Sequence, residues 1–113
     1  MLECQFLIPL TRDAETSDGA YHTSERWEWL DDALVLNFSG RTIAPGKYEG
    51  SWRSAKTRTT ISDESILYMV AVPEADVDRL RTLLKRACLL FKQQCIYLSV
   101  AGHVEFVEAE TND

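Results

Sequence analysis

The fold class is decided by one stretch, residues 66–91, which reads ILYMVAVPEADVDRLRTLLKRACLLF. Its beginning, up to Val72, is almost continuously apolar, which is typical of a strand covered on both faces. Pro73 then suits the first turn of a helix, and apolar side chains recur at helical spacing as far as Phe91. A buried strand that leads directly into an amphipathic helix predicts a sheet with helices packed on it.

Further strands and a second helix are predicted on both sides of this stretch. Residues 2–10 alternate apolar and polar side chains, as a half-buried strand does, and residues 11–22 form a long polar loop. A helix is expected to begin at Thr23 or Ser24 and to end near Gly40. Residues 41–72 are most simply a hairpin. Its strand segments are expected over residues 42–43, 48–52 and 61–72, with a turn at Pro45 and Gly46 and a polar loop over residues 53–60. Residues 95–107 predict one final strand.

The order of these elements is strand, helix, strand, strand, helix, strand. It predicts an α+β fold of the ferredoxin-like βαββαβ kind, a four-stranded antiparallel sheet with two helices on one face. We expect a single α+β domain over residues 1–107 and a polar C-terminal tail over residues 108–113.

Composition excludes several classes of function. The chain has 113 residues and a net charge of −6, which disfavours nucleic-acid binding because phosphates repel it. Cys4, Cys88 and Cys95 form no CxxC pair, so neither a disulfide framework nor a metal site is indicated. No cofactor motif is present, and neither a signal peptide nor a membrane-spanning stretch is seen, so we expect a cytoplasmic protein without a cofactor or membrane partner.

The sheet face without helices is the first candidate site. If one strand continues through Gly102, alternation places Tyr97, His103 and Glu105 on that face, together with Glu3. His103 and Glu105 could then act as an acid–base pair, or they could simply be two solvated side chains.

The segment GKYEGSWRSAKTR, residues 46–58, is the second candidate site. Trp52 and Arg53 lie in it beside further basic residues, which suits an anionic or aromatic ligand. The alternative is a hairpin whose Trp52 closes the core and whose tip is solvated. Glu64 follows on the next strand, where it either pairs with a hairpin arginine or marks the wet end of that strand.

The same open face predicts self-association. Leu67, Met69 and Tyr97 would expose an apolar patch there, and a homodimer formed face to face would cover it.

Several short motifs resemble a family of small bacterial proteins of unknown function. They are a helix that contains Trp27, Phe38-Ser-Gly-Arg-Thr42, Gly50-Ser-Trp-Arg53, Glu64-Ser65 and Phe91-Lys-Gln-Gln94. The resemblance covers most of the chain, but Cys95 stands where the family pattern has a small polar residue. It implies a fold more than an activity, since that family has no assigned reaction.

Two functions fit these observations. The first is a dimeric binding or interaction module, favoured by the half-apolar open face and the absence of a catalytic motif. The alternative is a cofactor-independent enzyme of the dimeric α+β-barrel kind, with a small-molecule ligand in a site on the open face. An RNA-recognition-like module is disfavoured because the chain is acidic and Leu67 and Met69 occupy the face that would need aromatic side chains.

Overall fold

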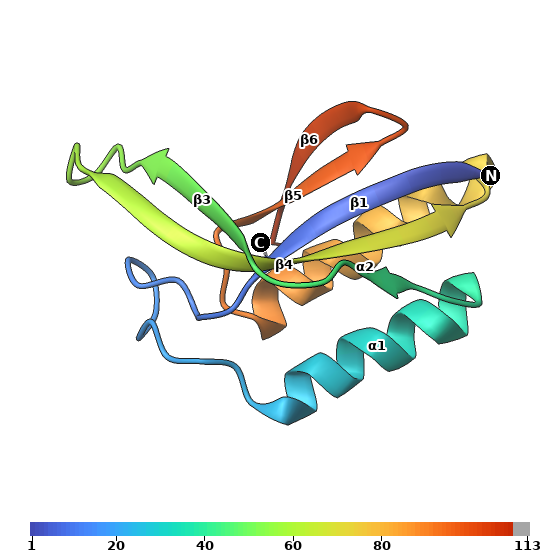
Figure 1. The fold of residues 1–113 in the computed structure, drawn as a ribbon, viewed down its shortest axis with the longest axis horizontal. Coiled ribbons are helices and arrows are strands. Elements are labelled where there is room, and N and C mark those ends of the chain that lie inside the picture. The colour runs from blue at the N-terminus through green and yellow to red at the C-terminus, as the bar shows by residue number, and fades with distance from the viewer. Residues whose placement is uncertain (110–113) are drawn as a thin grey trace, which may run out of the picture.

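The computed structural model describes residues 1–109, which form an α+β fold with one sheet of six antiparallel strands and two α-helices (Figure 1). The two long helices lie on the same side of the sheet. Along the chain the elements are β1 (Leu2–Pro9), α1 (Ser24–Phe38), β2 (Thr42–Ile43), β3 (Tyr48–Arg53), β4 (Thr60–Val72), a 3₁₀ turn (Glu74–Asp76), α2 (Val77–Leu90), β5 (Cys95–Val100) and β6 (His103–Glu108).

The strand order is β2-β4-β1-β5-β6, and β3 also pairs with β4. β4 is 13 residues long, so it pairs with β2 near its end, where Thr42 lies opposite Met69, and with β3 near its start. The three strand segments predicted over residues 42–43, 48–52 and 61–72 are therefore confirmed, each within one residue of its observed ends.

The predicted final strand is a hairpin, which corrects the four-stranded, ferredoxin-like description. The chain turns at Ala101 and Gly102, which both have positive φ, 48° and 87°, as a two-residue type I′ turn requires. Glycine adopts this conformation without steric cost, so Gly102 favours a reversal at a point where the side-chain pattern alone suggested continuation. β6 runs to Glu108, past the boundary expected after residue 107, and residues 110–113 of the predicted tail lie outside the described residues.

The core lies between the helices and one face of the sheet. The predicted stripe of α2 is confirmed, because Leu80, Leu84 and Phe91 are fully buried. β1 alternates as predicted and buries Cys4 and Phe6 against the helices, and the ring of Phe6 stacks on Tyr68 of β4 at 5.1 Å between centroids. Burial of these side chains is the main driving force for the fold.

The sheet extends beyond its helix-covered part as a two-stranded arm. The pairing of β1 with β4 ends at Pro9 and Ser65, whereas β3 and β4 continue to pair as far as Arg53 and Thr60. We call residues 51–53 and 60–62 the arm, and residues 49–50 and 63–64 its base. In Figure 1 it projects to the left of the helices.

Within residues 1–109, no helix is both long and apolar enough to cross a membrane.

Candidate ligand pocket at the base of the arm

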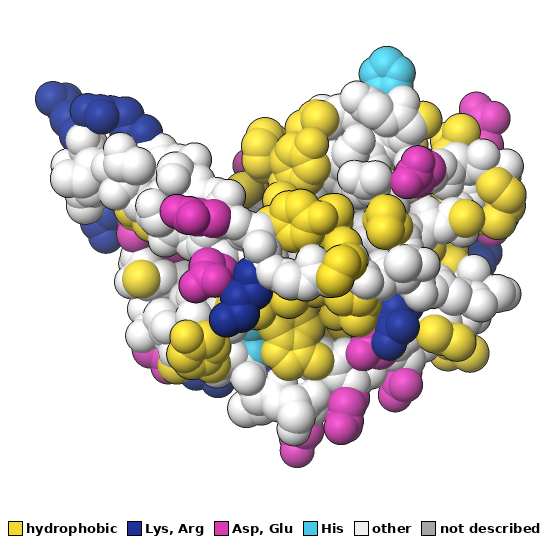
Figure 2. Space-filling model, in the orientation of Figure 1, with side chains coloured by type: hydrophobic (Ala, Val, Ile, Leu, Met, Phe, Trp, Pro, Cys, Tyr) yellow, Lys and Arg dark blue, Asp and Glu magenta, His cyan; other side chains and the backbone are white. Residues whose placement is uncertain are grey.

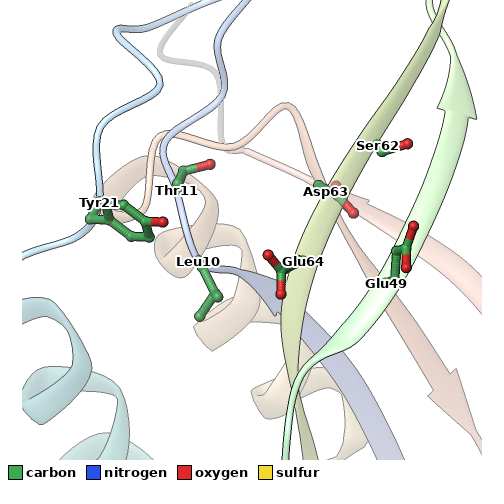
Figure 3. Close-up of a pocket in the computed structure, with 7 residues that line it drawn as sticks. All are labelled: Leu10, Thr11, Tyr21, Glu49, Ser62, Asp63 and Glu64. Carbon is green, nitrogen blue, oxygen red and sulfur yellow. The ribbon is translucent and has the colours of Figure 1, made fainter.

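A pocket of about 560 Å³ opens where β1 leaves the sheet and the arm begins (Figure 3). This volume is within the range of roughly 300–1,000 Å³ that is usual for small-molecule sites. The wall from the chain after β1 consists of Leu10, Thr11 and Tyr21, and the wall from β3 and β4 consists of Glu49, Ser62, Asp63 and Glu64.

The charge of the pocket is entirely negative. Glu49 and Glu64 lie opposite each other in the strand register and present their carboxyl groups on the same face, and no lysine or arginine lines the pocket. Asp63 also lines the pocket, but alternation along β4 places its side chain on the other face of the strand, beside Gly50. Of the two alternatives for Glu64, the structure supports the solvated end of the strand, because Glu64 is exposed and forms none of the ion pairs found in the described part of the chain. The same residue also lines the pocket. The pocket therefore suits a cation.

Asp63 is the most buried of these acids. Burial raises the pKa of its carboxyl group above the ordinary value, because a partly desolvated carboxylate is less stable. Gly50 lies opposite Asp63 in the strand register, and a Cβ atom at Gly50 would lie 3.0 Å from Asp63 Oδ1. A glycine at this position therefore leaves room for the Asp63 side chain.

Backbone hydrogen bonds hold the opposite wall in place. The Leu10 N–H donates to the Glu64 carbonyl oxygen at 2.9 Å, and Thr11 and Tyr21 form an isolated antiparallel bridge. The Gln93 side chain donates to the Thr11 carbonyl oxygen at 2.8 Å. The long polar loop predicted over residues 11–22 is thus tied to the sheet at several points and presents Tyr21 to the pocket.

His22 anchors the same loop to the core. Its ring is 9 % exposed and packs edge-on against Trp27 and Phe91, and Nε2 lies 2.8 Å from the Pro9 carbonyl oxygen. That contact makes Nε2 the protonated nitrogen, which leaves Nδ1 buried without a hydrogen-bond partner in the described residues. Burial lowers the pKa of His22, with smaller contributions from Arg12 and Arg26 in the same direction.

The structure separates the residues predicted to share the open face. Val100 lies opposite His103 in the β5–β6 hairpin, so β6 turns the residues expected on the open face toward the helix side. Glu105 accepts hydrogen bonds from Arg81 of α2 at 2.7 and 3.0 Å, and His103 is exposed beside the turn. The prediction that these two residues line the open face with Tyr97 is wrong, because it assumed an unbroken strand through Gly102.

The remaining predicted residues are also far apart in the sheet. Tyr97 does lie on the open face, where its ring packs edge-on against Phe106. Glu3 is exposed near the N-terminal end of β1. Trp52 and Arg53 are at the outer end of β3, where Trp52 is 38 % exposed and so does not close the core. A ligand-binding role for the six residues named from the sequence stays a prediction. They are Glu3, Trp52, Arg53, Tyr97, His103 and Glu105.

The apolar part of the open face is larger than predicted. The reversal at the hairpin adds Val104 and Phe106 to it, and these side chains are 54 % and 64 % exposed. Figure 2 shows apolar side chains in the middle of this view, between the arm and the β5–β6 hairpin.

Sequence reasoning missed most of the pocket. Only Glu64 was singled out, because it interrupts an apolar strand. A usable signal was present in the acidic residues on both strands at the base of the hairpin, since the strand register places Glu49 opposite Glu64. Tyr21 carried no signal, because its position depends on how a long loop folds back. Among the described residues, no group of three or more His, Cys, Asp or Glu side chains is arranged to hold a metal ion.

Two solved structures have a similar fold along almost the whole chain. A phage SAM lyase in complex with S-methyl-5′-thioadenosine has a TM-score of 0.67 and 13% identity, covering 99% of this chain and 92% of that chain. A phage SAM lyase in the apo state has a TM-score of 0.62 and 11% identity, with the same coverage. At this identity the likeness shows a shared fold.

No protein-family model and no curated protein sequence matches the chain. The resemblance to small bacterial proteins of unknown function is therefore not confirmed.

Proposed function

We propose that this protein is a cofactor-independent enzyme that cleaves a sulfonium substrate of the S-adenosylmethionine class in the pocket at the base of the arm. The observation that carries the proposal is a pocket of ligand size, whose charged residues are all acidic, in a fold shared with phage SAM lyases. It favours the enzyme alternative over the interaction module. It also moves the site from the middle of the open face to the end of β1.

The chemistry of a sulfonium fits this pocket. The substrate carries a positive charge on sulfur and a second one on its amino group, and both are attracted by carboxylates. S-methyl-5′-thioadenosine, the molecule bound in one of the similar structures, keeps the methyl and adenosyl groups on sulfur. Formation of that product breaks the third C–S bond. Its electron pair stays on sulfur and neutralises the positive charge, so no cofactor is required.

Each wall of the pocket would then have a distinct role. Glu49 and Glu64 supply the negative potential that attracts the cation, and the ring of Tyr21 offers it a π-face. The carbon fragment must either lose a proton or form a new bond to one of its own oxygens.

The homodimer across the open face is a separate proposal. The exposed Val104 and Phe106, next to Tyr97, support it, because exposed apolar patches of this kind often mark interfaces.

The test is binding and turnover of S-adenosylmethionine by the wild type and by Glu64→Gln. We expect calorimetric binding by the wild type, with S-methyl-5′-thioadenosine as a product in chromatography. Loss of one partly exposed charge should weaken binding about fivefold, equivalent to about 1 kcal/mol. Added salt should weaken wild-type binding as well, because it screens the attraction.

Glu28→Gln is the matched control, since Glu28 is an exposed glutamate on α1, outside the pocket. It should bind as the wild type does. Absence of both heat and product in the wild type would contradict the proposal, and equal weakening by the two variants would remove the pocket from the site.

A further inference from the structure

The outer edge of β3 is open within the described residues. β3 pairs only with β4, so one side of it presents backbone N–H and C=O groups that no other strand bonds. Beyond Pro9 and Ser65 the arm has no third strand, and a two-stranded ribbon is marginally stable by itself. Such an edge is a template for a further strand.

The charges along the arm are segregated. Residues 50–62 contain Arg53, Lys56 and Arg58 but no aspartate or glutamate, although the chain as a whole has a net charge of −6. Figure 2 shows the basic side chains at the outer end of the arm. The base carries Glu49 and the other acids of the pocket. None of these charged groups is in an ion pair found in the described residues.

We propose that β3 pairs antiparallel with β3 of a second copy of this chain, about a two-fold axis at Ser51. Antiparallel pairing runs the basic end of each arm along the acidic base of the other. With Ser51 opposite Ser51, Arg53 lies directly opposite Glu49 of the second copy, and the same contact recurs by symmetry. Residues directly opposite share a face of the sheet, so each such pair can form an ion pair.

The same register also accommodates Trp52. Trp52 comes to lie opposite Gly50 of the second copy, on the face where the Asp63 carboxyl group takes up the room over Gly50, so the indole ring can pack along that strand beside this group. Trp52 is 38 % exposed in the single chain and would be buried further. Large aromatic side chains of this kind contribute much of the energy of interfaces.

A second copy is favoured over an unrelated partner because the arm is complementary to itself. Copies with a charge of −6 repel each other in most orientations, and this register is one that brings opposite charges together twice. This inference goes beyond the proposed reaction and depends on neither its substrate nor its products.

The test is sedimentation of charge-reversed variants. The wild type should dimerise at micromolar concentration. Arg53→Glu and Glu49→Arg should each raise the dimer Kd by about tenfold or more. In each variant, residues 49 and 53 carry the same charge, and the two-fold axis places them opposite one another twice. An equimolar mixture of the two variants should recover dimers that contain one chain of each. In such a dimer, both glutamates of the Arg53→Glu chain lie opposite arginines of the Glu49→Arg chain.

Arg86→Glu is the matched control for Arg53→Glu, because Arg86 is exposed on α2 and this substitution makes the same change in net charge. It should leave the dimer unchanged, and circular dichroism should show that every variant is folded. A wild type that stays monomeric overturns the proposal, as does a mixture that stays monomeric. A dimer lost in Met69→Lys but kept in Arg53→Glu would assign the interface to the open face instead.

Discussion

The two halves of β4 belong to one strand but lie in different surroundings. Its second half pairs with β1 and contributes Tyr68, Val70 and Val72 to the core beneath the helices. Residues 60–64, in its first half, form strand pairs with β3 alone, and Ser62 in the arm and Glu64 at its base are exposed. The sequence changes at the same place, from ISDES to ILYMVAV.

This difference separates stability from chemistry. The covered half gains its stability from apolar surface that is removed from water. The uncovered half offers polar side chains and open backbone edges, and the acidic pocket forms at the boundary between the two. Loops and edges held by a rigid scaffold are where binding residues commonly lie.

The largest expected effect is on the covered half. Leu84 of α2 is fully buried against the sheet, so Leu84→Ala should lower the free energy of unfolding by about 2–5 kcal/mol. Urea denaturation followed by circular dichroism measures this change. Leu36→Ala is the control, because Leu36 is 86 % exposed on α1 and its loss should cost little. A cost below about 0.5 kcal/mol for Leu84→Ala would show that the helix does not pack as described.

A smaller effect is expected where the loop meets the covered half, at His22. Its pKa is lower in the folded protein than the ordinary 6.5, chiefly because of burial. The unfolded chain therefore binds a proton first as the pH falls below 6.5, so the stability contributed by neutral His22 is present above that pH and is lost below it.

Urea denaturation between about pH 7 and pH 5 tests this, within the range in which imidazoles titrate. His22→Leu removes the imidazole ring, so the free energy of unfolding of this variant should depend less on pH in this window. The exposed His103 provides the control, because His103→Ala should keep the slope of the wild type. An unchanged slope in His22→Leu would show that another group is responsible.

The smallest effect is expected in the arm. Ile61 is half-buried and lies opposite Trp52, with no helix over it, so Ile61→Ala should cost less than about 1 kcal/mol. The measurement is made in dilute solution, where any dimer dissociates. A cost equal to that of Leu84→Ala would remove the contrast between the two regions.

The local sequence pattern was sufficient to predict the elements that pack on each other in the core. The periodicity of α2 and the alternation of β1 predicted their buried residues, because a helix and a strand each have a fixed repeat. The reversal at Gly102 was missed, because a two-residue turn leaves the surrounding apolar pattern almost unchanged. That single error moved Glu105 to the helix side of the sheet and Phe106 to the open face.

The sequence by itself determined the α+β class, the two helices and the apolar strands, since these follow from interactions between residues near one another in the chain. Only the tertiary structure decided where β1 leaves the sheet, and therefore that Tyr21 and Glu64 line one pocket. These residues are brought together by strand register and by the path of a long loop. Both depend on contacts between distant segments, which no local pattern encodes.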